Sequence, residues 1–236
     1  EHVERRLRHY SYLNSGLRLI YNGKVFQSRN GLLDLVMEDL RADGSEPIYP
    51  PLHYAEKTLE FCFTHSNSRY GETFYSFVNG QYTSDGGTHL SAFREGLLKA
   101  VNEYAREKFE GDDVRESMVG AVAIRLKDPV FESQTKNKLG NTEIRTELVN
   151  RVREELLHFF NRNKEIAEKI IAKVQDTRQL RKELQEVKKL ARERAKPTQA
   201  WIFDMQEQAV SVATENERRT AMALADDWMT KYGRKK

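Results

Sequence analysis

One short polar segment carries the side chains best suited to chemistry. The segment FESQTKNKLGNT, residues 131–142, follows an apolar run and precedes a stretch with helical spacing. Lys136 and Lys138 each place a positive charge on a long stem, and Gln134 offers two amide donors. A helix that begins near Thr142 would point its free backbone N–H groups at the same place. These groups suit an anion such as a phosphate, but composition alone favours a solvated loop that binds nothing.

Two further groups of residues have types that occur in active sites. Asp112, Asp113, Arg115 and Glu116 lie together in GDDVRES, where a salt-bridge cluster is favoured over catalytic carboxylates. His89 follows two glycines, but no residue near it in the sequence would orient it as a general base, so a structural role is favoured. The sequence contains no GxxxxGK[ST], GxGxxG, HExxH or GxSxG motif. We therefore expect no catalytic residue in this chain.

Composition and cysteine content limit the class of protein. The 236 residues are 39% hydrophobic and 32% charged, with a net charge of +3, which suits one large or two small domains. Cys62 is the only cysteine, which excludes an internal disulfide and suits a cytoplasmic location. The six histidines show no metal-ligand spacing, so we expect no metal site. No apolar run reaches the roughly 18 residues of a membrane span, and Glu1 in place of Met indicates a fragment.

The first half of the chain predicts an antiparallel sheet with one helix. Asn22-Gly23 between two alternating apolar runs predicts a hairpin over residues 17–28, and a short amphipathic helix follows over 31–40. Strands are predicted over 58–66 and 73–79, and the polar link NSRYGE between them predicts a hairpin turn.

The second half predicts helices around one buried strand. A helix over 88–109 has Thr88 as its candidate N-cap, and GDDVRES follows as a loop. The apolar run over 118–126 predicts a strand buried on both faces. Apolar residues at helical spacing then predict a helix whose buried stripe is Ile144, Leu148, Val152, Leu156 and Phe160.

A long helix over residues 164–196 becomes strongly basic in its second part. Leu180, Leu184, Val187 and Ala191 form a narrow apolar seam there. A solvated helix with one packed edge is favoured, and a rigid basic strut directed at phosphate is the alternative. Pro197 ends this helix, and a further long helix is predicted from Thr198 to Gly233.

Four segments, in this order, resemble signatures of the B subunits of bacterial type IIA topoisomerases, either topoisomerase IV or DNA gyrase. They are RHYSYLNSG at 8–16, SFVNGQYTSDGGTHLSAF at 76–93, GDDVRES at 111–117 and SQTKNKLGN at 133–141. The resemblance implies an α+β transducer domain similar to the second domain of ribosomal protein S5. Such a domain has about four strands backed by helices, and here long C-terminal helices would follow it.

The resemblance also implies what the polar segment does. In the family, a Gln-Thr-Lys loop reaches the γ-phosphate of ATP, which a neighbouring ATP-binding domain holds with Mg²⁺. Carried over to this sequence, Gln134 and Lys136 contact that phosphate and Thr135 is their spacer. The basic helix would relay nucleotide state towards the DNA gate. The implied partners are the ATP-binding domain of the same subunit, the topoisomerase A subunit, a second B subunit joined on ATP binding, and DNA.

The resemblance predicts three parts and an inactive fragment. Residues 1–163 would be the transducer core, 164–197 the basic helix, and 198–236 a helical tail of unassigned origin. The family's ATP-pocket motifs and its metal-binding Glu-Gly-Asp motif do not occur in the sequence, so the chain alone should neither hydrolyse ATP nor cut DNA. Ser117 departs from the family pattern, which usually has Gly there. A stand-alone DNA-binding or protein-interaction module is the alternative, and a complete small ATPase is disfavoured.

Overall fold

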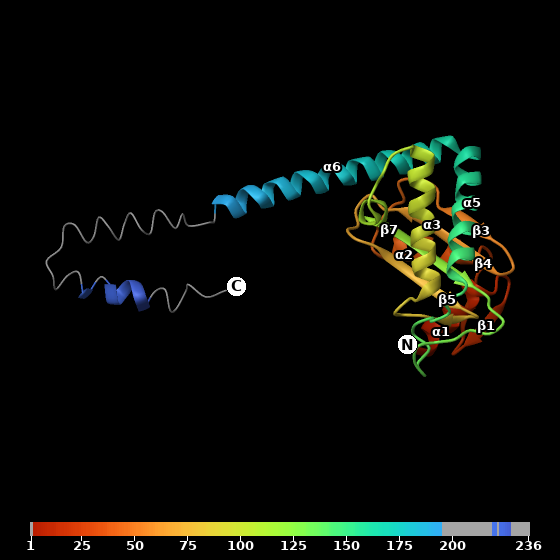
Figure 1. Cartoon of the computed structure of the whole chain (residues 1–236). Coiled ribbons are helices and arrows are strands. Elements are labelled where there is room, and N and C mark those ends of the chain that lie inside the picture. Colours follow the sequence, from red (N-terminus) through yellow and green to blue (C-terminus); the bar gives the residue numbers. More distant parts are fainter. Residues whose placement is uncertain (1, 195–218, 221, 228–236) are drawn as a thin grey trace. The chain divides into compact units, whose positions relative to one another are not determined.

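The computed structural model describes residues 2–194, 219–220 and 222–227 (Figure 1). The chain divides into two compact units, residues 1–181 and 182–236. Helix α6, Lys164–Arg194, begins in the first unit and continues into the second, whose other described residues are helical. The first unit contains, in chain order, α1 (His2–Leu13), β1 (Arg18–Tyr21), β2 (Lys24–Gln27), α2 (Leu32–Ala42), β3 (Leu52–Ala55), β4 (Leu59–His65), β5 (Thr73–Val78), β6 (Gln81–Tyr82), α3 (Thr88–Ala105), α4 (Gly111–Arg115), β7 (Met118–Ile124) and α5 (Arg145–Arg162).

Five strands form one mixed sheet in the order β3-β4-β7-β5-β6. β7 is antiparallel to β4 and parallel to β5, so the predicted hairpin between β4 and β5 is wrong. The apolar residues of β7 are buried on both faces, and a strand of that kind belongs at the centre of a sheet. The edge strands β3 and β6 have four and two residues, too short for the sequence pattern to indicate them.

Helices cover both faces of this sheet and produce two hydrophobic cores. On one face, α3, α5 and the start of α6 pack against Leu59, Phe61 and Phe63 of β4. On the other face, α1 and α2 pack against Cys62 of β4 and Val119 of β7. Figure 1 shows α3 and α5 side by side over their face of the sheet. The alternation along β4 therefore assigns each side chain to one of the two cores.

The predicted hairpin at residues 17–28 is confirmed, but it lies outside the main sheet. Among the residues that the structure describes, β1 and β2 pair only with each other. Asn22 and Gly23 have φ values of 50° and 75°, the positive values that a tight two-residue hairpin turn requires. The predicted helices that correspond to α2, α3, α5 and α6 are confirmed, as are the strands β4, β5 and β7.

Two local predictions around helix ends are wrong. The segment GDDVRES contains the short helix α4, because Glu110 and Asp113 form a reciprocal capping box that stabilises one helical turn. The N-cap of α3 is Gly87 rather than Thr88, which is the first helical residue. The backbone of Gly87 has a φ of 126°, a conformation open to glycine alone, so glycine displaces threonine from the cap position.

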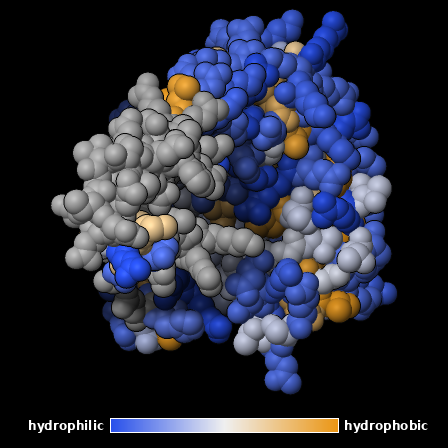
Figure 2. All heavy atoms as spheres, turned by 60° about the vertical axis from the view of Figure 1, so that its left-hand side comes forward, coloured by the Kyte–Doolittle hydropathy of each residue, from blue (hydrophilic) through white to orange (hydrophobic). Residues whose placement is uncertain are grey.

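The apolar seam on the basic helix has no packed edge in the described part of the chain. Leu180, Leu184 and Val187 are 57%, 51% and 62% exposed, so the favoured solvated helix is confirmed and its packed edge is wrong for the described residues. The molecular face in Figure 2 is mostly hydrophilic, with apolar side chains in small separate patches. The predicted helix from Thr198 to Gly233 lies almost entirely outside the described residues.

The parallel pairing of β5 and β7 brings two distant segments to one edge of the sheet. Val78 at the end of β5 pairs with Ile124 at the end of β7. The carboxyl ends of parallel strands share an edge, and ligand sites in α/β sheets form there. The segment that follows β5 leads to Gly86 and Gly87, and the segment that follows β7 leads to residues 131–142. The segments that follow β5 and β7 therefore lie close together in space.

Candidate phosphate-contacting site

Residues 131–142, the Gln-Thr-Lys loop, form a small irregular hairpin. Phe131 and Leu139 make an antiparallel bridge, and the Glu132 N–H donates to the Lys138 carbonyl at 3.1 Å. At the tip, the Lys136 N–H donates to the Ser133 carbonyl at 3.1 Å, which closes a tight turn around Gln134 and Thr135. The loop is therefore an ordered projection rather than an unstructured connection.

The two lysines of the loop differ in their surroundings. Lys138 forms an ion pair with Glu132, with 3.0 Å between Nζ and Oε2. The side chain of Lys136 is exposed and has no hydrogen-bond or ion-pair partner among the residues that the structure describes, and the same holds for the side chain of Gln134. The structure thus leaves one cation and one amide of the loop available to a ligand, and it neutralises the other cation.

The backbone at Lys136 is in a sparsely populated conformation. Its φ of 55° lies in the left-handed region, which costs a non-glycine residue on the order of 1 kcal/mol. Strain of this kind occurs often at functional sites, where the surrounding contacts maintain it. At Lys136 this backbone conformation lies at the tip of the loop, next to the turn around Gln134 and Thr135.

The helix that follows the loop begins later than the sequence predicts. α5 starts at Arg145, with Ile144 as its N-cap, and the Arg145 N–H bonds the Thr142 carbonyl. The Arg145 guanidinium pairs with Glu95 of α3 at 2.7 Å. The free N–H groups of α5 therefore do not begin at Thr142, and the predicted helix-dipole contribution to the loop is wrong in its placement.

A hollow of about 360 Å³ lies between the loop and the start of α3. It contains two cationic side chains, Arg94 and Lys138. Arg94 makes two hydrogen bonds to Glu72, at 3.0 and 2.7 Å, and Lys138 is paired with Glu132. Because both cations are already neutralised, this hollow is a weaker anion site than the loop tip.

The predicted salt-bridge cluster of GDDVRES is confirmed, with a partner that sequence proximity does not indicate. Asp113 has a fully buried side chain and receives two hydrogen bonds from Arg181 of α6, at 2.7 and 3.1 Å. Arg181 also pairs with Glu110 at 3.0 Å. We call Glu110, Asp113 and Arg181 the α4 anchor. The Asp113 carboxylate is buried and all three charges are paired with one another, so the α4 anchor fixes structure and offers no free charge to a substrate.

The structural role favoured for His89 is confirmed. The side chain is 1% exposed, and its Nε2 lies 3.2 Å from the Thr83 hydroxyl. Burial lowers the pKa of His89 to about 4, so the ring is neutral at physiological pH. Inside the first unit it cannot reach a substrate. His65, which is also buried, has its pKa lowered to about 4 by burial and bonds Tyr49 and the Val114 carbonyl.

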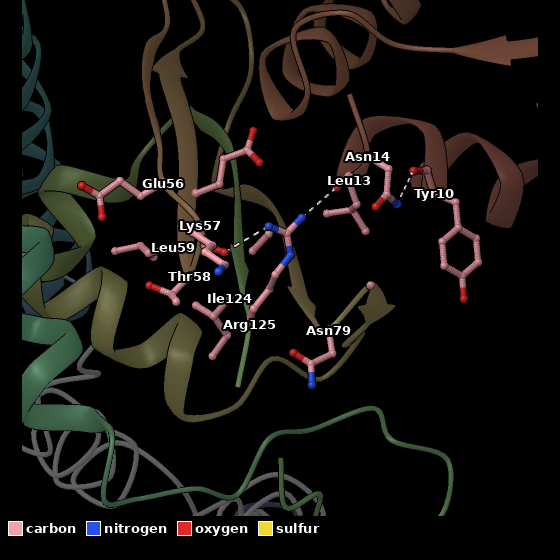
Figure 3. A pocket seen from close by; sticks show the side chains of 13 residues that line it. Tyr10, Leu13, Asn14, Glu56, Lys57, Thr58, Leu59, Asn79, Ile124 and Arg125 are labelled. Atoms are coloured by element: carbon pink, nitrogen blue, oxygen red, sulfur yellow. Dashed lines mark hydrogen bonds between the residues drawn. The ribbon is translucent and has the colours of Figure 1, made fainter. Parts of the chain in front are cut away.

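A second hollow of about 360 Å³ lies around Arg125 (Figure 3). The guanidinium lies between two backbone carbonyls and donates to Lys57 at 3.0 Å and to Leu13 at 3.3 Å. No lining residue of this hollow belongs to the Gln-Thr-Lys loop. Arg125 thus serves to join α1 to the start of β4, and the sequence signal for this role is absent because both acceptors are backbone atoms.

A sequence model of the DNA gyrase B family matches residues 31–190, more than half of the chain. The chain belongs to the DNA gyrase B family. The B subunit of DNA topoisomerase 4 from Borreliella burgdorferi is 47% identical over 82% of this chain and 32% of its own length. The DNA gyrase B subunit of Thermotoga maritima is 32% identical over 80% of this chain and 34% of its own length. The chain therefore spans about a third of these relatives and is a region of a type IIA topoisomerase B subunit.

Solved structures of the same family share the fold. The 43K ATPase domain of Thermus thermophilus gyrase B, in complex with an aminocoumarin, superimposes with a TM-score of 0.68 at 30% identity. The match covers 80% of this chain and 56% of that domain. The topoisomerase IV ATP-binding domain of Francisella tularensis gives a TM-score of 0.63 at 20% identity. The α+β arrangement of a mixed five-stranded sheet with helices thus resembles part of the gyrase B ATPase-domain fold.

Metal ligation and membrane insertion find no support in the described residues. Among them, no three His, Cys, Asp or Glu side chains are grouped so that they could hold a metal ion. Nor does any helix in these ranges have the length and apolar content needed to cross a bilayer.

Proposed function

We propose that residues 1–163 form the transducer core of a type IIA topoisomerase B subunit, similar to the second domain of ribosomal protein S5. Gln134 and Lys136 contact the γ-phosphate of ATP held by the ATP-binding domain of the same subunit. The basic helix over residues 164–197 relays nucleotide state to the DNA gate. Residues 198–236 form a tail of unassigned origin. The relatives named above and the ordered Gln-Thr-Lys loop support this assignment.

One observation carries the proposal about the loop. The Lys136 side chain is a solvent-exposed cation with no protein partner in the described part of the chain, at the tip of a hydrogen-bonded hairpin. A lysine that only keeps a loop soluble needs no ordered hairpin and no strained backbone. A lysine that must reach a phosphate on a neighbouring domain needs both a defined position and an unpaired charge.

The β1–β2 hairpin supports a docking partner within the same subunit. Ile20 and Val25 are 65% and 50% exposed, and Leu17 and Tyr21 are 42% and 37% exposed. Both strands also have one edge without a partner among the described residues, because β1 and β2 pair only with each other. An apolar, unpaired hairpin of this kind suits burial against another domain. We assign that surface to the ATP-binding domain.

The described residues include side chains that fit the γ-phosphate of ATP but no group of side chains that could hold Mg²⁺. ATP held by the neighbouring domain would supply a γ-phosphate whose negative charge is spread over its oxygens, and the side chains of Gln134 and Lys136 would fit that group. The described residues offer no acidic cluster for Mg²⁺, so its ligands are assigned to the neighbouring domain. At the ATP site, the contribution of this chain is therefore limited to contacts with the phosphate.

Replacing Lys136 tests the proposal in the full-length subunit. Lys136→Ala should reduce ATP hydrolysis by about 10² or more, the scale for loss of a well-placed charge stabiliser. Binding of ADP, which lacks the γ-phosphate, should be almost unchanged. The free energy of unfolding should change by no more than about 0.5 kcal/mol, because the side chain is exposed.

Lys138→Ala is the matched control, because it removes the same charge two residues away. The Glu132 pair already neutralises Lys138, so its loss should change ATP hydrolysis only slightly. Equal losses for the two variants, or full hydrolysis by Lys136→Ala, would return the loop to a solvated surface role.

The remaining partners are proposed for the whole subunit: the A subunit, a second B subunit upon ATP binding, and DNA. Residues 182–192 of α6 are all exposed, and they include Lys182, Lys188, Lys189 and Arg192. If this segment contacts DNA, binding should be weak, independent of sequence and salt-sensitive, because only phosphates are read. Affinity that stays constant between low and physiological salt in a titration would exclude this contact and favour a protein-interaction module.

A further inference from the structure

The Gly-Gly-Thr-His turn and the Gln-Thr-Lys loop lie about fifty residues apart in sequence but form one unit in space. The Leu139 N–H donates to the Gly86 carbonyl at 3.1 Å, and the Thr88 N–H donates to the Leu139 carbonyl at 3.0 Å. Gly87 and Leu139 thereby form a parallel bridge. A third bond, from the Asp85 N–H to the Asn137 carbonyl at 3.0 Å, extends the contact towards the loop tip.

Leu139 is held from three directions. Its backbone bonds the glycine turn on one side and bridges Phe131 on the other. Its side chain is 1% exposed and belongs to the core beneath α3 and α5. Leu139 is therefore a fixed point, and Lys136 lies three residues before it at the end of a short turn.

Gly87 makes this close approach possible. A Cβ on Gly87 would lie 2.4 Å from both the nitrogen and the carbonyl oxygen of Leu139, far inside van der Waals contact. The neighbouring atoms are backbone, so they cannot rotate away as a flexible side chain would. Any side chain at this position therefore displaces Leu139, and the loop with it.

We propose that Gly87 is a positioning residue for the Gln-Thr-Lys loop: it lets the start of α3 clasp Leu139 and so fixes where Lys136 projects. We call the hydrogen bonds that join Leu139 to Gly86 and Thr88 the clasp. The effect of Gly87 on ATP hydrolysis rests on the proposed contact between Lys136 and the γ-phosphate, whereas the clasp itself does not. Because Thr88 is the first residue of α3, the same clasp links the loop directly to the helix that covers the sheet. A displacement of the loop tip is therefore passed to the start of α3 through backbone hydrogen bonds alone.

Amide hydrogen exchange on the 236-residue chain tests the clasp without nucleotide. Gly87→Ala should accelerate exchange at Lys136 and Leu139, whose N–H groups are bonded in the intact loop. Gly44→Ala is the matched control, since Gly44 also has a positive φ, 72°, but a Cβ there meets no atom within 4 Å. Unchanged exchange in Gly87→Ala would overturn the proposal.

A double-mutant cycle on ATP hydrolysis by the full-length subunit tests the positioning role. Gly87→Ala should reduce turnover about tenfold or more, since a displacement of about 1 Å is enough for such losses. In the Lys136→Ala background, Gly87→Ala should cause almost no further loss, because it acts through Lys136. Losses that multiply would overturn the positioning role, because a merely destabilised fold produces that result. If Lys136→Ala leaves ATP hydrolysis unchanged, the proposed function is wrong. Hydrogen exchange still tests whether the clasp holds the loop.

Thr88→Pro provides a second variant that suits the fold. Proline is favoured at the first position of a helix, but its ring removes the N–H that bonds Leu139 and occupies its space. It should reproduce both the faster exchange and the non-additive loss of turnover, including where Gly87→Ala does not fold. A folded Thr88→Pro with wild-type exchange and turnover would overturn the proposal.

Discussion

The Gln-Thr-Lys loop and the α4 anchor are both rich in charge, and they use it in opposite ways. In the α4 anchor, the fully buried Asp113 carboxylate receives two hydrogen bonds from Arg181. In the loop, the Lys136 side chain is exposed and has no partner in the described part of the chain. A buried ion pair fixes the relation between two elements, whereas an unpaired exposed cation is available to a ligand. Pairing and burial, rather than residue type, separate structural charge from functional charge.

The largest effect on stability should come from breaking the α4 anchor. Arg181→Ala leaves the buried Asp113 carboxylate without its cation and should lower the unfolding free energy more than loss of an exposed ion pair does. Adding Asp113→Asn should recover part of that loss, because a buried amide costs less than an unpaired charge. Denaturant titration measures both values.

The exposed ion pair between Lys138 and Glu132 in the loop is the control for the pair between Arg181 and the buried Asp113. Lys138 and Glu132 have side chains that are 46% and 52% exposed, so Lys138→Ala should change stability by less than about 1 kcal/mol. Losses of similar size for Arg181→Ala and Lys138→Ala would remove the distinction between the two clusters.

Acid should destabilise the first unit through its two buried histidines. Burial lowers the folded-state pKa of His65 and His89 to about 4, below the unfolded value of about 6.5. Their stabilising contribution is therefore complete above pH ~6.5 and is lost as the pH falls towards ~4. Between pH ~7 and ~5 each should contribute a loss of about 2 kcal/mol.

His89→Leu provides the check on this pH dependence. It removes one of these titrations, so the slope of unfolding free energy against pH between ~6.5 and ~4.5 should become smaller. An unchanged slope, measured by denaturant titrations across that range, would assign the acid sensitivity to other groups.

A smaller, stabilising effect is expected at Ser117. Its φ is 62°, which favours glycine, and its buried hydroxyl has no hydrogen-bond partner in the described part of the chain. Ser117→Gly should raise the free energy of unfolding by about 1 kcal/mol, which thermal denaturation can measure. A destabilised Ser117→Gly would show that the left-handed backbone is not strained.

The smallest effect should come from deleting residues 198–236. The buried residues of the described chain lie between Ser11 and Val174, so we expect the first unit to keep its core when the tail is removed. The truncated chain should retain a cooperative thermal transition at nearly the same temperature. Loss of that transition would assign the tail to the core.

Local sequence patterns determined most elements and the chemistry of the loop. Period-two alternation identified β4, helical spacing identified α3 and α5, and the Asn22-Gly23 turn identified the hairpin, because each pattern depends only on neighbouring residues. The family signatures indicated Gln134 and Lys136, whose contact with phosphate stays a prediction. Position in the sequence could not show that Lys138 is neutralised and Lys136 is not.

Only the tertiary structure decided which strands are neighbours and which motifs meet. β7 separates β4 from β5, although the short link between β4 and β5 predicts a hairpin, because an apolar strand gains most at the centre of the sheet. β5 and β7 are parallel neighbours, and the segments that follow them bring Gly87 to Leu139. Such contacts depend on long-range packing, which local patterns do not encode. The pairing of Asp113 with Arg181 could not be predicted from the sequence for the same reason.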